Sequence, residues 1–130
     1  MINDVIREAS DSANVFKKFI GRDKIQTQEF FAVMYMAQNN KVLGVYVHSM
    51  GAMTATQADI RLILGGALRI GAVSMIISHN HPSGNLIPSD ADLSLTKKII
   101  QAAATHDIRV LDHIIVTKDG FYSFLQEGKM

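Results

Sequence analysis

Apolar residues recur along this chain with two different periods, which predicts a mixture of helices and strands. Residues 5–20 carry apolar side chains at helical spacing and are followed by Gly21, so we predict an amphipathic helix that ends there. Residues 29–37 form a nearly continuous apolar run, which is typical of a strand buried on both faces. A polar turn at residues 38–41 and a second apolar run at 42–48 complete a predicted hairpin.

Helical and extended patterns also alternate in the second half of the chain. The spacing predicts one helix over residues 56–70 and another that begins after Ser89, its N-cap, and runs to about residue 106. The apolar stripe of the first of these helices comprises Ile60, Ile63, Leu64, Ala67 and Leu68. Short strands are predicted at residues 73–78, 109–117 and 121–124. Hairpins combined with crossover helices favour an α/β fold, with helices packed on the faces of a mixed central sheet.

Length and composition narrow the class of protein. With 130 residues the chain is long enough for one globular domain with its own core. No apolar run approaches the roughly 20 residues that cross a bilayer, and the first residues lack a secretory signal core, so we predict no membrane partner and a cytoplasmic location. The absence of cysteine excludes a disulfide framework and agrees with that location.

The charge of the chain bears on nucleic-acid binding. The formal net charge is only +1, whereas proteins that grip many phosphates usually carry a strong basic excess. The local basic cluster is interpreted as a solvated helix end and turn; it comprises Lys17, Lys18, Arg22 and Lys24. A nucleic-acid partner is therefore possible but weakly supported.

Two histidines and an aspartate form the most informative motif. His79 and His81 lie two residues apart at a predicted strand end, so their side chains point the same way. Asp92 is the third residue of the helix that follows, beside the positive end of the helix dipole, which keeps the carboxylate ionised. These three ligands would bind a zinc ion and leave a fourth position for water, as in catalytic zinc sites. A surface loop and an ordinary helix cap are the alternative interpretation.

A hydrolytic site also needs a proton acceptor. The glutamates of the chain are Glu8, Glu29 and Glu127, and only Glu29 opens an apolar strand, where a carboxylate is costly without partners or a purpose. Glu29 is therefore the candidate general acid/base, and a solvated strand end is the alternative. Ser89 accepts a backbone hydrogen bond as N-cap, which leaves its hydroxyl proton available to an oxyanion. Spacing alone does not establish that second role.

The other polar residues of the predicted strands are weaker candidates. Asp112 and His113 are adjacent on a strand, so their side chains point to opposite faces of the sheet. One of them is a candidate hydrogen-bond partner of a ligand histidine, and a hydrogen-bonded core pair is the alternative. His48 and His106 are interpreted as ordinary surface or strand-end residues.

The run SHNHPSGNLIPSDAD, residues 78–92, has the form H-x-H-x7-S-x2-D and resembles the metal motif of the JAMM (JAB/MPN) metalloenzymes. The string HNHPSG, together with LDHIIV at residues 111–116, is similar to the RadC branch of that superfamily, the RadC-like JAB domain. The resemblance covers roughly residues 25–128. It implies a cytidine-deaminase-like, three-layer α/β/α domain over residues 25–130, with residues 1–24 as an N-terminal helix of the same globular unit.

The resemblance also implies roles for individual residues. The zinc ligands would be His79, His81 and Asp92, with Glu29 as general acid/base and Ser89 stabilising the oxyanion. Several members of the superfamily hydrolyse peptide or isopeptide bonds, so the implied activity is that of a Zn²⁺-dependent metallopeptidase with a peptide or protein substrate. The alternative is a catalytically silent metal-binding module in DNA repair, recombination or protein assembly. The oligomeric state stays open, and the absence of cysteine excludes a zinc deaminase.

Overall fold

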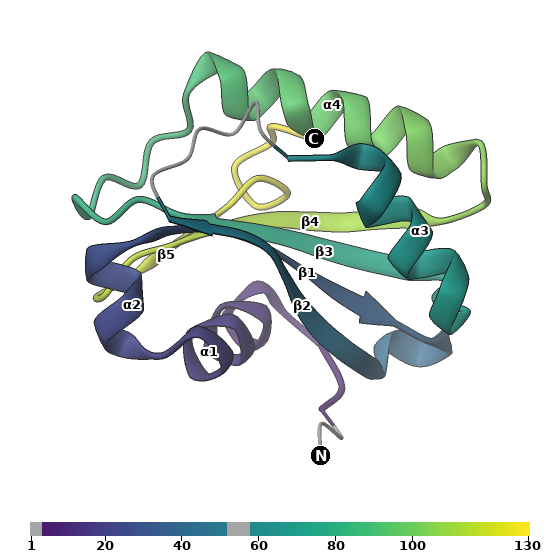
Figure 1. The fold of residues 1–130 in the computed structure, drawn as a ribbon, viewed down its shortest axis with the longest axis horizontal. Coiled ribbons are helices and arrows are strands. Elements are labelled where there is room, and N and C mark those ends of the chain that lie inside the picture. The colour runs from purple at the N-terminus through teal and green to yellow at the C-terminus, as the bar shows by residue number, and fades with distance from the viewer. Residues whose placement is uncertain (1–3, 52–57) are drawn as a thin grey trace.

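The computed structural model describes residues 4–51 and 58–130, which form a five-stranded sheet with helices on both faces (Figure 1). The helices are α1 (Ala9–Ile20), α2 (Arg22–Thr27), α3 (Ile60–Ile70) and α4 (Asp90–Ala104), and a short 3-10 turn, η1, spans Gln38–Asn40. The strands are β1 (Glu29–Met36), β2 (Val42–Gly51), β3 (Ser74–Asn80), β4 (Arg109–Val116) and β5 (Phe121–Ser123). Within the described residues, no helix is both long and apolar enough to span a membrane.

The sheet has the strand order β2-β1-β3-β4-β5. β3 and β4 are parallel, and the other neighbouring strands are antiparallel. α4 connects the parallel pair, as a crossover helix must. The predicted α/β class with a mixed sheet is confirmed, whereas the cytidine-deaminase-like assignment stays a prediction.

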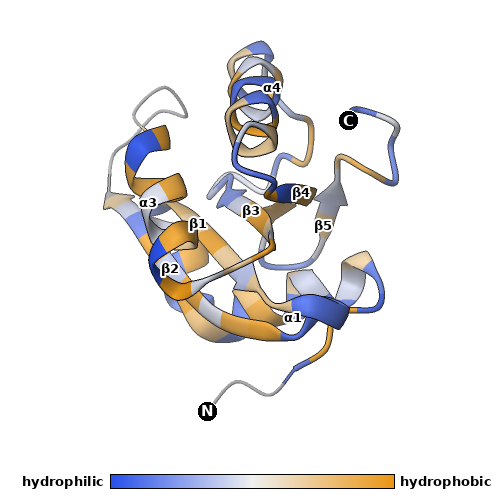
Figure 2. Ribbon diagram, turned by 90° about the vertical axis from the view of Figure 1, so that its right-hand side faces the viewer, coloured by the Kyte–Doolittle hydropathy of each residue, from blue (hydrophilic) through white to orange (hydrophobic). Residues whose placement is uncertain are grey.

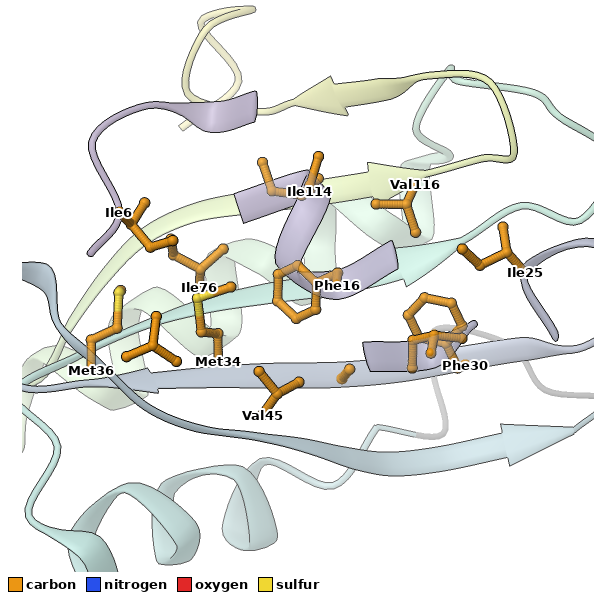
Figure 3. Packing of buried hydrophobic residues seen from close by; sticks show 14 residues of the cluster. Ile6, Phe16, Ile25, Phe30, Met34, Met36, Val45, Ile76, Ile114 and Val116 are labelled. Atoms are coloured by element: carbon orange, nitrogen blue, oxygen red, sulfur yellow. The ribbon is translucent and has the colours of Figure 1, made fainter. Parts of the chain in front are cut away.

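Two apolar cores lie on the two faces of the sheet. Alternate residues of β1 point to opposite faces, so Phe30 and Met34 pack under α1 and α2 while Phe31 and Val33 pack under α3 and α4. Figure 3 shows the first core, in which the ring of Phe16 from α1 lies over the strands. The hydropathy colouring shows the apolar residues gathered along the central strands (Figure 2). The strand predicted to be buried on both faces is therefore confirmed.

The N-terminal segment differs from the prediction. The first helix begins at Ala9 rather than at residue 5, because Val5 forms a β-bridge with Lys41 and Asp4 accepts a backbone hydrogen bond from Val42. The helix ends at Gly21 as predicted, but a second, six-residue helix, α2, follows at once. Only Ile25 of α2 is buried, so this helix has no apolar period for a sequence pattern to detect.

The helix predicted over residues 56–70 is α3, which begins only at Ile60 because Asp59 is its extended N-cap; residues 56–57 lie outside the described part of the chain. The predicted stripe is wrong at Leu68, which is 55% exposed. Tyr35 of β1 reaches the underside of α3 and donates a hydrogen bond to the carbonyl of Ile63 at 2.7 Å. A Cβ at Gly66 would lie 2.5 Å from the Tyr35 hydroxyl oxygen, so glycine permits this close approach.

Candidate metal centre

Strand pairing assembles the site at one edge of the sheet. β1 runs antiparallel to β3 with Phe31 opposite His79, so the first residue of β1, Glu29, lies beyond the end of β3. The side chain of Asn80 points to the face of the sheet opposite to that of His79, and its hydrogen bonds fix the pairing of β1 with β3. It accepts a hydrogen bond from Phe30 N–H at 2.8 Å and donates to backbone carbonyls of the α2 segment at 2.7 Å each. Asn80 therefore holds the start of β1 beside the end of β3.

A cavity of about 310 Å³ opens at this edge of the sheet. All five predicted site residues are among those that line it: Glu29, His79, His81, Ser89 and Asp92. They come from the start of β1, the end of β3 with the residue that follows it, and the first turn of α4 with its N-cap. Tertiary structure thus brings together residues that are up to 63 positions apart in the chain.

Three donor atoms face one another in the cavity. His79 Nε2 lies 3.1 Å from His81 Nε2 and 3.3 Å from Asp92 Oδ2, and His81 Nε2 lies 3.5 Å from the same oxygen. Ligand atoms bound tetrahedrally to zinc at about 2.0–2.1 Å are separated from one another by about 3.3 Å. The geometry and chemistry of the donor set therefore fit a divalent metal ion, and the three residues form a possible metal site.

Asp92 carries the negative charge of this cluster. Its side chain is almost completely buried, with the residue 3% exposed. Burial alone would raise the pKa of Asp92, but its contacts with the imidazoles of His79 and His81, together with the backbone N–H of Ser89, outweigh burial and hold the pKa well below its usual range. The same contact with Asp92 raises the pKa of His81, against the opposing effect of burial. The carboxylate is ionised, as a metal ligand must be.

Hydrogen bonds outside the cluster orient two of the three ligands. His81 Nδ1 lies 2.7 Å from the carbonyl oxygen of Asn85. A carbonyl only accepts, so Nδ1 is the protonated nitrogen of a neutral His81 and Nε2 offers a lone pair to the cluster. The N–H of Ser89 donates to Asp92 Oδ2 at 2.8 Å, and the N–H of Asp92 donates to Ser89 Oγ at 3.1 Å. The predicted N-cap is thus confirmed as a full capping box.

Comparison with known proteins identifies the family. A family model described as the RadC-like JAB domain matches residues 6–129. The chain belongs to this family. The matched region includes α1 and is therefore longer than the stretch of residues 25–128 that carries the sequence resemblance.

Relatives of this RadC-like JAB domain include two proteins named only as UPF0758 proteins. The protein from Flavobacterium johnsoniae is 38% identical over 123 residues, which cover 95% of the chain and 52% of the relative. The protein from Trichodesmium erythraeum is 47% identical over 102 residues, which cover 78% of the chain and 42% of the relative. The chain thus spans about half the length of the curated relatives it matches.

In this RadC-like JAB domain, the adjacent residues Asp112 and His113 have different surroundings. Their side chains point to opposite faces, as predicted, and His113 is the one that reaches the metal centre, with Nε2 2.7 Å from His79 Nδ1. Asp112 instead accepts hydrogen bonds from Ser123 Oγ and Leu125 N–H. Sequence reasoning missed Thr96, whose hydroxyl oxygen lies 2.6 Å from His113 Nδ1. Its position one turn after Asp92, on the same helix face, was the available signal.

The remaining histidines lie outside the metal centre. His48 is only partly exposed, and its Nε2 lies 2.9 Å from the hydroxyl oxygen of Tyr35. The interpretation of His48 as an ordinary surface or strand-end residue is therefore incomplete, because its ring contacts the buried Tyr35. His106 is exposed beyond the end of α4 and contacts Thr105 and the carbonyl of Ala102, which agrees with its interpretation as a surface residue.

Proposed function

We propose that this RadC-like JAB domain is a Zn²⁺-dependent hydrolase of peptide or isopeptide bonds. The observation that carries the proposal is the convergence of three donor atoms at tetrahedral spacing in a cavity that Glu29 also lines. The ion would be held by the Nε2 atoms of His79 and His81 and by Asp92 Oδ2. Two imidazoles and one carboxylate form a donor set that suits zinc.

The donor types favour zinc over Mg²⁺ or Ca²⁺. Those ions prefer oxygen ligands, whereas two of the three candidate donors are imidazole nitrogens, which suit zinc. Three protein ligands with room for one further ligand are the arrangement of catalytic rather than structural zinc sites.

The zinc ion would supply a Lewis acid that lowers the pKa of a bound water towards about 7. Glu29 is half-buried at the cavity wall, and its charge is near enough to contribute to the raised pKa of His81. Its carboxylate takes a proton from the attacking water and returns it to the departing amine, so the proton balance closes within one turnover. The hydroxyl of Ser89, which accepts the N–H of Asp92, keeps its own proton for the oxyanion that grows on the substrate carbonyl.

Replacement of Glu29 tests the proposal. We expect the zinc-loaded protein to cleave members of peptide and isopeptide libraries and Glu29→Gln to be at least about 100-fold slower with a similar zinc affinity. Glu127→Gln is the matched control, because Glu127 is exposed near the C-terminus. Equal turnover by Glu29→Gln would contradict the role of Glu29. Tight zinc binding without turnover of any substrate would support a metal-binding module that assists DNA transactions or protein assembly instead.

A further inference from the structure

A buried polar chain extends from the metal centre into the protein, and it carries an inference that rests on the proposed zinc site. We propose that His113 is a positioning residue that holds His79 in the tautomer offering Nε2 to the metal, and that Thr96 fixes the tautomer of His113 in turn. The chain therefore has a third histidine in its metal centre that is not a ligand.

The contacts of His113 form a continuous line. His113 is 0% exposed, with Nε2 2.7 Å from His79 Nδ1 and Nδ1 2.6 Å from Thr96 Oγ1. The Thr96 hydroxyl donates to the backbone carbonyl of Asp92 at 2.8 Å. The line thus begins at one proposed ligand, Asp92, and ends at another, His79. Each ring nitrogen of His113 has one polar partner, so both nitrogens can form a hydrogen bond.

The direction of these hydrogen bonds follows from the protons available. A hydroxyl has one proton, and Thr96 donates it to the Asp92 carbonyl, so its oxygen can only accept from His113 Nδ1–H. A completely buried imidazole whose partners are a hydroxyl and another imidazole is neutral, so its Nε2 has no proton and accepts from His79 Nδ1–H. His79 Nε2 is then a free lone pair that points at Asp92 Oδ2 and His81 Nε2.

The opposite polarity would disable the site. If Thr96 donated to His113 instead, His113 would donate to His79, and the proton of His79 would stand on Nε2, the atom required by the metal. The helix carbonyl of Asp92 is the partner that keeps the Thr96 proton away from His113. A threonine in a helix commonly makes this bond to the carbonyl four residues earlier.

Aromatic packing fixes the plane of the His113 ring. The ring of Phe124 stacks on it with centroids 4.2 Å apart and planes inclined by 13°, and Phe31 lies edge-on at 6.3 Å. The Phe124 N–H donates to the carbonyl of His113, and Asp112 binds Ser123 and Leu125 on either side of Phe124. The C-terminal turn is therefore fastened so that Phe124 covers His113, which leaves the imidazole little freedom to rotate away from His79.

The tautomers can be observed directly by long-range ¹⁵N–¹H NMR of the zinc-loaded, histidine-labelled protein. We expect His113 and His79 to be protonated on Nδ1 and not on Nε2. A merely space-filling His113 would instead favour the Nε2–H form, as free histidine side chains do. Observation of His113 protonated on Nε2 in the zinc-loaded protein would overturn the proposal.

Zinc affinity provides the second readout, measured by competition with a chelator. His113→Phe retains an aromatic ring against Phe124 but cannot accept a proton from His79, and we expect zinc affinity to fall by about 10- to 100-fold. His113→Gln can place its amide oxygen close to the position of Nε2, so we expect it to recover most of that loss. Equal zinc affinity in the wild type and a folded His113→Phe would overturn the proposal and leave the proposed zinc site intact.

The outcomes separate the two proposals. If the wild-type protein itself does not bind zinc, both the zinc site and the role of His113 fail. If His113→Phe does not fold, Thr96→Val, which preserves the shape of the side chain, decides the matter. We expect that variant to bind zinc several-fold more weakly and to populate the Nε2–H tautomer of His113. Unchanged affinity together with an unchanged tautomer would overturn the role of Thr96 and His113.

Discussion

His79 and Asn80 are neighbours on β3, and their side chains enter two very different polar environments on opposite faces of the sheet. Asn80 uses both amide protons and its oxygen on the backbone: it accepts from Phe30 N–H and donates twice, to the carbonyls of Ile25 and Gln28. His79 meets two further acceptors, His81 Nε2 and Asp92 Oδ2, with its own free lone pair. The same strand thus has one polar group whose partners are backbone groups and one that faces two further acceptors.

β4 repeats this contrast one strand away. Asp112, on the face of Asn80, accepts hydrogen bonds from Ser123, Leu125 and the N–H of His113. His113, on the face of His79, extends the metal centre inward. Saturated buried polar groups hold segments of the fold together, whereas converging acceptors without donors indicate a site for a cation. The buried polar groups on the face of Asn80 therefore stabilise the fold, whereas those on the face of His79 form the candidate metal centre.

The largest expected effect is on stability, at Asn80. Asn80→Ala removes the partners of the Phe30 N–H and of the carbonyls of Ile25 and Gln28, and it detaches α2 from β1. We expect the free energy of unfolding to fall by about 3 kcal/mol, because each unsatisfied buried group costs about 1–3 kcal/mol. Urea denaturation monitored by circular dichroism measures this change. A loss below about 1 kcal/mol would contradict the claim that the hydrogen bonds of Asn80 hold this face of the fold together.

Asp92→Asn tests the face of His79. The amide oxygen can still accept the Ser89 N–H, but the charge whose contacts with His79 and His81 depress the Asp92 pKa is lost, so we expect the metal-free protein to lose stability as well. Zinc affinity should fall by at least about 100-fold, equivalent to about 2.7 kcal/mol, because the charged ligand is lost. Added zinc should raise the melting temperature of the wild type but not that of the variant. Equal zinc affinities would exclude Asp92 as a ligand.

The pH dependence of stability tests the surroundings of Asp112, which lies on the same face of the sheet as Asn80. Burial raises the pKa of Asp112 and outweighs the hydrogen bonds from Ser123, Leu125 and His113. The folded protein therefore binds this proton more tightly than the unfolded chain does. The contribution of Asp112 to stability is fully present below its ordinary pKa and is lost as the pH rises through the raised value.

Asp112→Asn removes this titration and retains an oxygen that can accept the N–H groups of His113 and Leu125. We expect the free energy of unfolding of the variant, relative to the wild type, to increase as the pH rises from about 4 to about 7. Denaturation of both proteins across that range gives the difference, from which titrations common to the two proteins cancel. A difference independent of pH would contradict the raised pKa.

The smallest effect is expected at Ser78, which serves as the matched control for Asn80. Both side chains lie on the same face of β3 and both are buried, but Ser78 Oγ has no hydrogen-bond partner within the described residues. Ser78→Ala should change the free energy of unfolding by no more than about 0.5 kcal/mol, because no bond is lost. Denaturation curves of the two alanine variants can be compared directly. A large loss at Ser78 would mean that burial alone, without hydrogen bonding, explains Asn80.

Elements with strong local signals lie where the sequence predicts them. β1 is a long apolar run, and the start of α4 has its capping box in the sequence, so both are found at the expected positions. α2 was missed because a six-residue helix with one buried side chain has no period. Residue 5 was wrongly included in α1 because its apolar side chain continues the helical spacing although its backbone pairs with Lys41.

The residues of the candidate site also fall into those that local rules predict and those that only tertiary structure places. The common direction of His79 and His81 follows from strand alternation, and the place of Asp92 follows from the helix start, so both were predictable from local rules. The position of Glu29 in the same cavity depends on the pairing of β1 with β3, which joins residues far apart in the chain. The sequence motif therefore predicted which residues form the candidate site, and the strand order explains how they come together.

By itself, the sequence determined the α/β class, the set of candidate metal-binding side chains and the opposite directions of Asp112 and His113, because each depends on short-range periodicity. Only the tertiary structure decided that His113, rather than Asp112, faces the metal centre, and that Thr96 completes the line behind it. The bonds of His113 span 34 residues to His79 and 17 residues to Thr96. Their existence depends on the register of β4 beside β3 and on the packing of α4 over both strands, which no local pattern of residues records.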